Sequence, residues 1–191
     1  MKSLILACIV CMMAAACSNS KEETKNSIVT NDTTSFYPIA SYINDQVKYF
    51  DSTGVRFSVV ITEGTKKDST TTQLIAVMPM IQSFIDADIS DSVQKINYKE
   101  SVFRDAGTAS LNINYTPTNT LVPVRNIDIL MDDQTSLIKR LFIRKQFQTN
   151  DTTSIEQMSW KTNEGFTKSI SKEASNGFLL NKTIAVRVIL P

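Results

Sequence analysis

The chain contains no histidine among its 191 residues. This absence excludes Ser-His-Asp and Cys-His catalytic groups and histidine metal sites, and it removes the side chain that most often transfers protons near neutral pH. Glycine is also scarce, with five residues in the whole chain, and none of them forms a glycine-rich phosphate-binding loop. Any catalysis would therefore depend on carboxylates, hydroxyls, lysines or tyrosines.

The chain has little net charge and few cysteines. Twenty basic residues nearly balance 19 acidic ones, so no basic excess attracts nucleic acid, and we expect no nucleic-acid partner. The three cysteines, Cys8, Cys11 and Cys17, all lie near the N-terminus. If the chain is cleaved before Cys17, only one cysteine remains, which excludes an intrachain disulfide bond.

The first 17 residues have the layout of an export signal. One cation, Lys2, precedes an uncharged apolar run over residues 4–16, which ends in three alanines directly before Cys17. A membrane-spanning helix needs about 20 apolar residues, so this run is too short to be one. The pattern predicts a signal peptide over residues 1–16.

The position of Cys17 directly after the three alanines resembles the lipobox of bacterial lipoproteins. The resemblance implies that the signal peptide is removed, and that Cys17 becomes the first residue and carries the lipid that anchors the chain to a membrane. The alternative is an ordinary secreted protein with a cysteine near its cleavage site. Lys21, Glu22 and Glu23 resemble the surface-export signal of Bacteroidota lipoproteins, and the alternative for them is a charged, solvated tether.

Residues 17–35 are polar and almost free of large apolar side chains. Such a segment cannot offset its loss of conformational entropy by burial, so we expect a lipidated flexible tether followed by one domain over residues 36–191. Five short sequences resemble the Asp-Ser/Thr O-glycosylation motif of exported Bacteroidota proteins, and all of them fall in expected loops or element ends. Their hydroxyl residues are Thr33, Ser52, Ser69, Ser92 and Thr152.

Two helices are expected in the N-terminal half of the domain. Apolar residues recur every three or four positions over residues 36–50, which predicts a helix capped by Ser35 and ended by Gly54. The same period over residues 73–87 predicts a second helix, in which Pro79 introduces a kink or marks the true start.

Most of the remaining domain alternates apolar and polar residues, which is typical of strands. The expected strands cover residues 55–63, 69–72, 96–104, 110–116, 124–131, 137–148, 155–161, 166–172 and 178–190. Consecutive strands joined by short turns favour an antiparallel sheet, and the alternation leaves one face polar, as a wet surface or the lining of a cleft. The predicted fold is therefore α+β, a curved antiparallel sheet of about eight strands with the two helices packed on one face.

Acidic residues are the first candidates for chemistry. A hard cation such as calcium takes oxygen ligands, which Asp86, Asp88 and Asp91 could supply, but we favour a capped turn for them and for the Asp132-Asp133 pair. Two carboxylates could also serve a glycoside hydrolase, although no spacing pairs any two of the glutamates. These glutamates are Glu63, Glu100, Glu156, Glu164 and Glu173. We expect no metal, no cofactor and no catalytic residue.

Basic residues gather along the strand expected over residues 137–148. They are Lys139, Arg140, Arg144 and Lys145, with Arg125 nearby in the sequence. On the polar face they would form a basic stripe for a lipid headgroup or an acidic glycan. Trp160 and Phe147 would line the same surface, although a lone tryptophan in a strand is usually half buried in the core. The alternative, which we favour, is that these charges protect a sheet edge and keep it solvated.

The whole chain resembles the small envelope lipoproteins of the Bacteroidota, with a lipobox, a polar tether, a first helix that carries an Ile-x-x-Gln-x-x-x-(Tyr/Phe)-like motif beginning at Ile43, and a strand-rich body. The resemblance implies an anchor in the outer membrane, on its periplasmic or surface face, and no known activity. We expect a non-catalytic binding or assembly module for a lipid, a glycan or an envelope protein. The most specific form of this expectation is a LolA/LolB-like half-barrel that encloses an apolar cavity. The alternative is a histidine-free hydrolase of envelope or external glycans that uses two carboxylates.

Overall fold

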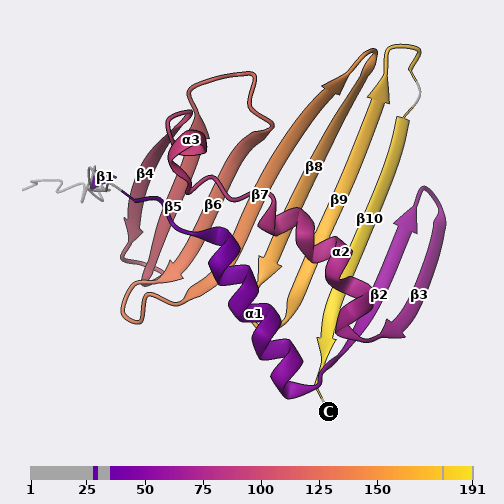
Figure 1. Cartoon of the computed structure of the whole chain (residues 1–191), viewed down its shortest axis with the longest axis horizontal. Coiled ribbons are helices and arrows are strands. Elements are labelled where there is room, and N and C mark those ends of the chain that lie inside the picture. The colour runs from indigo at the N-terminus through magenta and orange to yellow at the C-terminus, as the bar shows by residue number, and fades with distance from the viewer. Residues whose placement is uncertain (1–27, 30–34, 178, 191) are drawn as a thin grey trace, which may run out of the picture.

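The computed structural model describes residues 28–29, 35–177 and 179–190, and Figure 1 shows their arrangement. The predicted lipidation, export and first glycosylation residues lie outside these ranges, so their roles stay predictions. These residues are Cys17, Lys21, Glu22, Glu23 and Thr33. The described chain forms one open antiparallel sheet, and two helices lie in front of it in Figure 1.

Within the described residues, the sheet has nine strands of seven residues or more and one strand of two residues. The strands are β1 (Ile28–Val29), β2 (Arg56–Glu63), β3 (Lys66–Thr72), β4 (Tyr98–Asp105), β5 (Ser110–Pro117), β6 (Val124–Asp132), β7 (Ile138–Thr149), β8 (Thr152–Lys161), β9 (Gly165–Ala174) and β10 (Leu179–Ile189). The helices are α1 (Ile39–Thr53), α2 (Leu74–Ile85) and the single turn α3 (Ser92–Lys95).

Neighbouring strands follow the order β1-β4-β5-β6-β7-β8-β9-β10-β2-β3, and each pair is antiparallel. The sheet-rich α+β class is therefore confirmed, with nine full strands where the sequence predicted about eight. Strand β3 is longer than predicted, because it begins at Lys66 and the prediction began at Ser69. Its seven residues are all polar, so they show no alternation, and the strand forms through its pairing with β2 at the edge of the sheet.

Helix α1 begins three residues later than predicted, and Ser35 does not cap it. The residue at its N-cap position is Pro38, which has no capping side chain. A carboxylate from a distant loop takes this role, because Asp88 Oδ2 accepts the backbone N–H of Ala40 at 2.7 Å. The predicted stop is confirmed, since Gly54 adopts the left-handed conformation with φ of 62° at the end of the helix.

Helix α2 begins at Leu74 and contains Pro79 in its interior, so the interpretation of Pro79 as the true start is wrong. Proline lacks the N–H that would donate to the carbonyl four residues earlier, which here belongs to Ile75. Ile75 is 77% exposed, so water can satisfy that carbonyl. The buried residues Val77, Ile81 and Phe84 keep the helical period on either side of the proline.

The face of the sheet toward the helices is packed around Trp160, which is fully buried. Its indole stacks on Phe166 with ring centroids 5.2 Å apart, and Phe84 of α2 meets it edge-on at 5.2 Å. Phe50 of α1 stacks on the same indole at 6.1 Å. Gln46 Oε1 accepts the indole N–H at 3.4 Å, so the buried donor is satisfied. Aromatic rings fill the space between helices and sheet at this point.

The alternation predicted over residues 137–148 is wrong at the start of strand β7, since a regular period would place Leu137 in the apolar row of Leu141 and Ile143. Leu137 is 67% exposed, and Ile138 is buried in its place. The register with β6 shifts here, because Leu130 pairs with Arg140 and Met131 pairs with Ile138, which leaves Lys139 as an extra residue. A strict two-residue period cannot anticipate this bulge, since the partner strand determines it.

Candidate functional site

The opposite face of the sheet is covered by neither α1 nor α2, and we call it the helix-free face. Residues that pair in register on neighbouring antiparallel strands point to the same face. Lys161 follows the buried Trp160, so its cross-strand row lies on the helix-free face. This row is Arg140, Lys161, Gly165 and Arg187, and the neighbouring rows are Phe142, Ser159 and Thr167, then Arg144, Gln157 and Ser169.

Two open cavities hollow the helix-free face over strands β6 to β10. The first has a volume of about 540 Å³ and includes Gly165, and the second has a volume of about 610 Å³ and includes Arg144. Ser159 and Thr167 line both cavities, so the two join along β8 and β9. We call the joined cavities the arginine groove, because Arg125, Arg140, Arg144 and Arg187 contribute to the lining.

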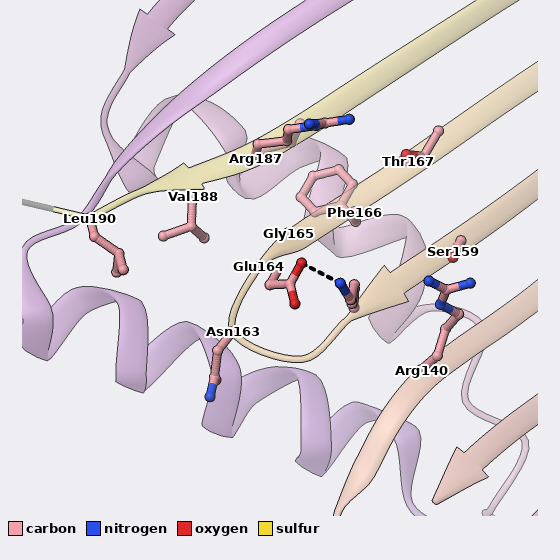
Figure 2. Close-up of a pocket in the computed structure, with 12 residues that line it drawn as sticks. Arg140, Ser159, Asn163, Glu164, Gly165, Phe166, Thr167, Arg187, Val188 and Leu190 are labelled. Atoms are coloured by element: carbon pink, nitrogen blue, oxygen red, sulfur yellow. Dashed lines mark ion pairs between the residues drawn. The ribbon is translucent and has the colours of Figure 1, made fainter. Parts of the chain in front are cut away.

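Gly165 forms the hollow in the first cavity. Its φ is 120°, and a Cβ atom added there would lie 2.2 Å from the backbone oxygen of Val186. Only glycine allows this close approach of the two backbones. As a result, the row of side chains between Lys161 and Arg187 is interrupted by a position without a side chain (Figure 2).

Three arginines around the groove are exposed and lack a carboxylate partner. In the described part of the chain, no acidic side chain lies within ion-pairing distance of Arg140, Arg144 or Arg187. The guanidinium of Arg140 lies 5.5 Å from the ring centroid of Phe142. Lys161, in contrast, forms an ion pair with Glu164 at 2.6 Å (Figure 2). The groove therefore presents three uncompensated positive charges to solvent.

The one carboxylate in the second cavity, Asp128, is held by amides. Asn114 Nδ2 donates to Asp128 Oδ1 at 2.6 Å, and Asn126 Nδ2 donates to Asp128 Oδ2. Arg125 Nη1 donates to the carbonyl of Thr120, but its Nε is buried without a partner among the described protein atoms. The second cavity thus contains an unused buried donor beside a carboxylate whose oxygens are already engaged.

The placement of the basic stripe is correct for part of its residues, whereas the sheet-edge protection that we favour from the sequence is wrong, because β7 is paired on both sides, with β6 and β8. Arg140 and Arg144 lie on the helix-free face, and Arg125 lines the same groove. Lys139 is the bulged residue and forms an ion pair with Asp132 at 3.0 Å, so it does not join them. Arg187 and Gly165 were missed. The position of Arg187 between the apolar residues Val186 and Val188 indicates that it lies on the polar face. The sequence does not indicate that Arg187 lies in the row of Arg140, because the pairing of β8 with β9 and of β9 with β10 determines this.

The basic-stripe hypothesis places Lys145, Phe147 and Trp160 on the polar surface, and the structure contradicts this; Trp160 lies in the core, as the alternative interpretation of this residue predicts. All three lie on the helix-facing side with Leu141. Lys145 and Phe147 are an even number of residues from Leu141 on β7, and Trp160 pairs with Leu141 across the β7–β8 ladder. Lys145 is 8% exposed, and this burial lowers the pKa of its ammonium group, while the carboxylate of Glu156 opposes the shift. A lysine in an apolar row is not recognisable as buried from the alternation of the sequence alone.

The aspartates proposed as a cation site serve as caps and turn residues. Asp86 Oδ1 accepts a bond from Gln82 at 2.8 Å, and Asp88 caps α1. Asp91 Oδ1 accepts the backbone N–H of Val93 at 2.8 Å and caps α3. Among the described residues, no three acidic or cysteine side chains are grouped as a metal site. The capped-turn interpretation explains each carboxylate.

Asp132 and Asp133 also belong to a turn. Asp132 accepts backbone N–H groups from Gln134 and Thr135 and pairs with Lys139, and these donors hold the pKa of its carboxyl well below its usual range. Asp133 Oδ2 accepts from Arg104 Nη2 at 2.9 Å. The β6–β7 connection and Lys139 therefore account for Asp132, whereas Asp133 joins this connection to β4 through Oδ2 and keeps its Oδ1 buried without a partner among the described protein atoms.

The predicted glutamates do not converge in the groove. Glu63 pairs with Lys182 at 3.6 Å, and Glu156 pairs with Lys168 at 3.2 Å on the helix-facing side. Glu164 is the carboxylate of the first cavity, and Asp128 is that of the second. Neither cavity lining contains a pair of carboxylates, which is the arrangement that glycoside hydrolysis requires.

Four of the glycosylation candidates lie in the described chain. Ser52 lies near the end of α1, Ser92 at the start of α3 and Thr152 at the start of β8, as the motif positions predict. Ser69 lies inside β3 rather than at its start. Ser52, Ser69 and Ser92 are exposed, and Thr152 is partly exposed. Modification of these hydroxyls stays a prediction.

No protein-family model, curated protein sequence or solved structure matches this chain. The helices of the described residues are each too short or too polar to cross a membrane.

Proposed function

We propose that this protein is a non-catalytic binding module of the cell envelope, anchored to the outer membrane through lipid on Cys17, with the arginine groove as its ligand surface. The observation that carries the proposal is the set of three exposed arginines without carboxylate partners around a hollow whose lining also includes hydroxyl and amide side chains. Exposed charges on a sheet usually alternate in sign or form pairs, which lowers their mutual repulsion. Here the positive charges gather where the surface is concave.

The start of the sheet is compatible with an anchored module. Strand β1 pairs with β4 through Ile28 and Val29, inside the segment predicted as a tether. Ile28 follows Cys17 by 11 positions in the chain, so a fully extended tether spans at most about 36–40 Å. An acylated Cys17 would therefore hold the sheet close to the membrane surface, where a glycan, a lipid headgroup or an envelope protein is within reach.

The packing between the helices and the sheet favours a ligand site on the helix-free face over the enclosed cavity of a LolA/LolB-like half-barrel. A carrier of that type needs an apolar cavity between helices and sheet. In this protein Trp160, Phe50 and Phe84 occupy that space and are fully buried. No observation in the described residues favours the hydrolase alternative either, because each cavity contributes a single, already bonded carboxylate.

Two measurements on the full chain test this proposal. The first is the intact mass of the protein purified from bacterial membranes beside its Cys17→Ala variant, and we expect cleavage before Cys17 and an acyl mass that the variant lacks. The second is an amide chemical-shift map recorded with four probes: hexagalacturonate, maltohexaose, poly-glutamate and phosphatidylglycerol vesicles. At least one probe should shift amides of β7 to β10 around the groove. An unacylated protein would contradict the anchor, and a map without groove shifts would contradict the ligand surface.

A further inference from the structure

We infer that the arginine groove binds an acidic glycan, a sugar chain that carries repeated carboxylate or sulfate groups. One anionic group lies in the hollow at Gly165, between Arg140 and Arg187, and a second lies at Arg144. The inference rests on the proposed function, since it names the ligand of the same face.

The spacing of the arginines indicates a ligand with several charges. Arg140 and Arg144 are four residues apart on β7, which places their Cα atoms about 14 Å apart. Arg187 lies in the same row as Arg140 but three strands away, again at about 14 Å. Two long side chains can converge on one anion between them, but all three cannot. A chain with anionic groups at intervals satisfies the whole set.

The guanidinium groups suit carboxylate and sulfate groups. Each can donate two parallel N–H bonds to the oxygens of one anion, which fixes the orientation of the anion as well as its position. Arg187 lies next to Gly165 in the cross-strand row, and Arg140 lies on the other side beyond Lys161, so the space that Gly165 leaves for the anion is between the two arginines (Figure 2). Both arginines are exposed and lack an acidic partner in the described chain, so binding does not require that an existing ion pair be broken.

The floor of the groove suits sugar hydroxyls. Gln157, Ser159, Thr167 and Ser169 line it, and hydroxyl and amide side chains both donate and accept hydrogen bonds. Phe142, which is 41% exposed, is the aromatic side chain in the same row. Nucleic acid would require several aromatic platforms for its bases, and Arg140 already lies over this ring. The polar floor therefore favours a glycan.

The position of the groove argues against an acidic peptide. Peptides often bind a sheet by adding a strand at its edge, where backbone groups are unpaired. The groove lies over β6 to β10, each of which is hydrogen-bonded to a neighbour on both sides. Its backbone donors and acceptors are used in the sheet, so side chains alone must recognise the ligand.

The test is isothermal titration of the full chain with hexagalacturonate, using maltohexaose as the neutral hexasaccharide. We expect the acidic hexamer to bind with an affinity that falls as salt rises, and the neutral one to bind at least tenfold more weakly. Arg140→Ala/Arg187→Ala should reduce the affinity tenfold or more, and Arg144→Ala severalfold. Arg140→Lys/Arg187→Lys keeps the charge but loses the paired N–H bonds, so it should fall between wild type and the alanine variant.

Lys99→Ala is the matched control, because Lys99 is an exposed cation on the same face but on β4, outside the groove. Its affinity should stay within twofold of the wild type. Equal binding of the neutral hexamer, or an equal effect of Lys99→Ala and the double variant, would overturn the inference. If poly-glutamate, oligo(dT) or phosphatidylglycerol vesicles bind at the groove more tightly than hexagalacturonate, the assignment of an acidic glycan as the ligand is wrong. The proposal that the groove is a ligand surface would still stand. If no probe binds at the groove, both fail.

Discussion

The two faces of this sheet come from the same strands and differ in almost every physical respect. The helix-facing side places Trp160, Phe57 and Leu141 in a dry, close-packed core, and each of these side chains is fully buried. The helix-free side alternates with them residue by residue and exposes arginines, amides and hydroxyls around a hollow. The comparison teaches that the first face determines the stability of the fold, while the second is available for binding. Substitutions on the two faces should therefore have separable effects.

The largest loss of stability should follow Trp160→Ala. The indole is fully buried and contacts Phe50, Phe84 and Phe166, so its removal leaves a cavity that the neighbouring rings cannot fill. We expect a decrease of about 3–5 kcal/mol in the free energy of unfolding, measured by urea denaturation. Phe142→Ala on the helix-free face should cost less than about 1 kcal/mol. Similar costs for both variants would break the distinction between the faces.

The next largest effect should come from Gly165→Ala, because the helix-free face has a close contact between two backbones at this position. The new Cβ would overlap the backbone oxygen of Val186, and φ of 120° is unfavourable for alanine. We expect a loss of about 2–4 kcal/mol in the free energy of unfolding. Gly64→Ala is the control, since its φ of 58° is also strained but no atom lies within 4 Å of the added Cβ. It should cost about 1–2 kcal/mol. Equal losses in thermal denaturation would show that contact with Val186 is unimportant.

A smaller effect is expected where a loop fixes a helix to the covered face. Asp88→Ala removes the acceptor for the Ala40 N–H at the start of α1, and should cost about 1–2 kcal/mol. Asp88→Asn keeps an acceptor and should recover at least half of this loss. Asp86→Ala is the matched control, because its partner Gln82 lies on the exposed surface, and it should change stability by less than about 0.5 kcal/mol. Hydrogen exchange of the first α1 amides would locate the effect, and unchanged exchange in Asp88→Ala would contradict the capping role.

Lys145 gives the smallest effect and a specific dependence on pH. Burial lowers its pKa in the folded state, so the folded protein holds this proton less tightly than the unfolded chain does. The cost of the buried charge is therefore present in full at low pH and falls as the pH rises through the folded pKa toward the ordinary value of 10.5. At pH 7 the free energy of unfolding of Lys145→Met should exceed that of the wild type by up to about 1 kcal/mol. The advantage of the variant should shrink between pH 7 and pH 10 in urea denaturation. A constant difference would show that Lys145 is not desolvated.

The features that the sequence predicts and those that it misses have different physical origins. Local rules suffice for the stop at Gly54, for the alternation in β2 and for the placement of Arg140 and Arg144 on the polar face. The remote cap on α1 depends on Asp88, 48 residues beyond its partner. The bulge at Lys139 depends on pairing with β6. Such contacts join segments that are distant in the chain, so no local pattern contains them.

The same limit applies to the candidate site. Arg140 and Arg144 belong to one strand, and their shared face could be predicted from an even separation. Arg187 and Gly165 come from β10 and β9, and only the registers β8–β9 and β9–β10 bring them into the row of Arg140. The basic strand is therefore predictable from the sequence, but the hollow beside it is not. Trp160 does not line the polar surface, because it pairs with Leu141 in an apolar row on the helix-facing side.

The affinity of the Arg140→Ala/Arg187→Ala variant for hexagalacturonate, relative to that of the wild type, tests the central claim most directly. Both side chains are exposed and unpaired with acids in the described chain, so their loss should leave the unfolding midpoint nearly unchanged. We predict a loss of binding of tenfold or more with a folded, equally stable protein. An unchanged affinity would contradict the assignment of the helix-free face to ligand binding.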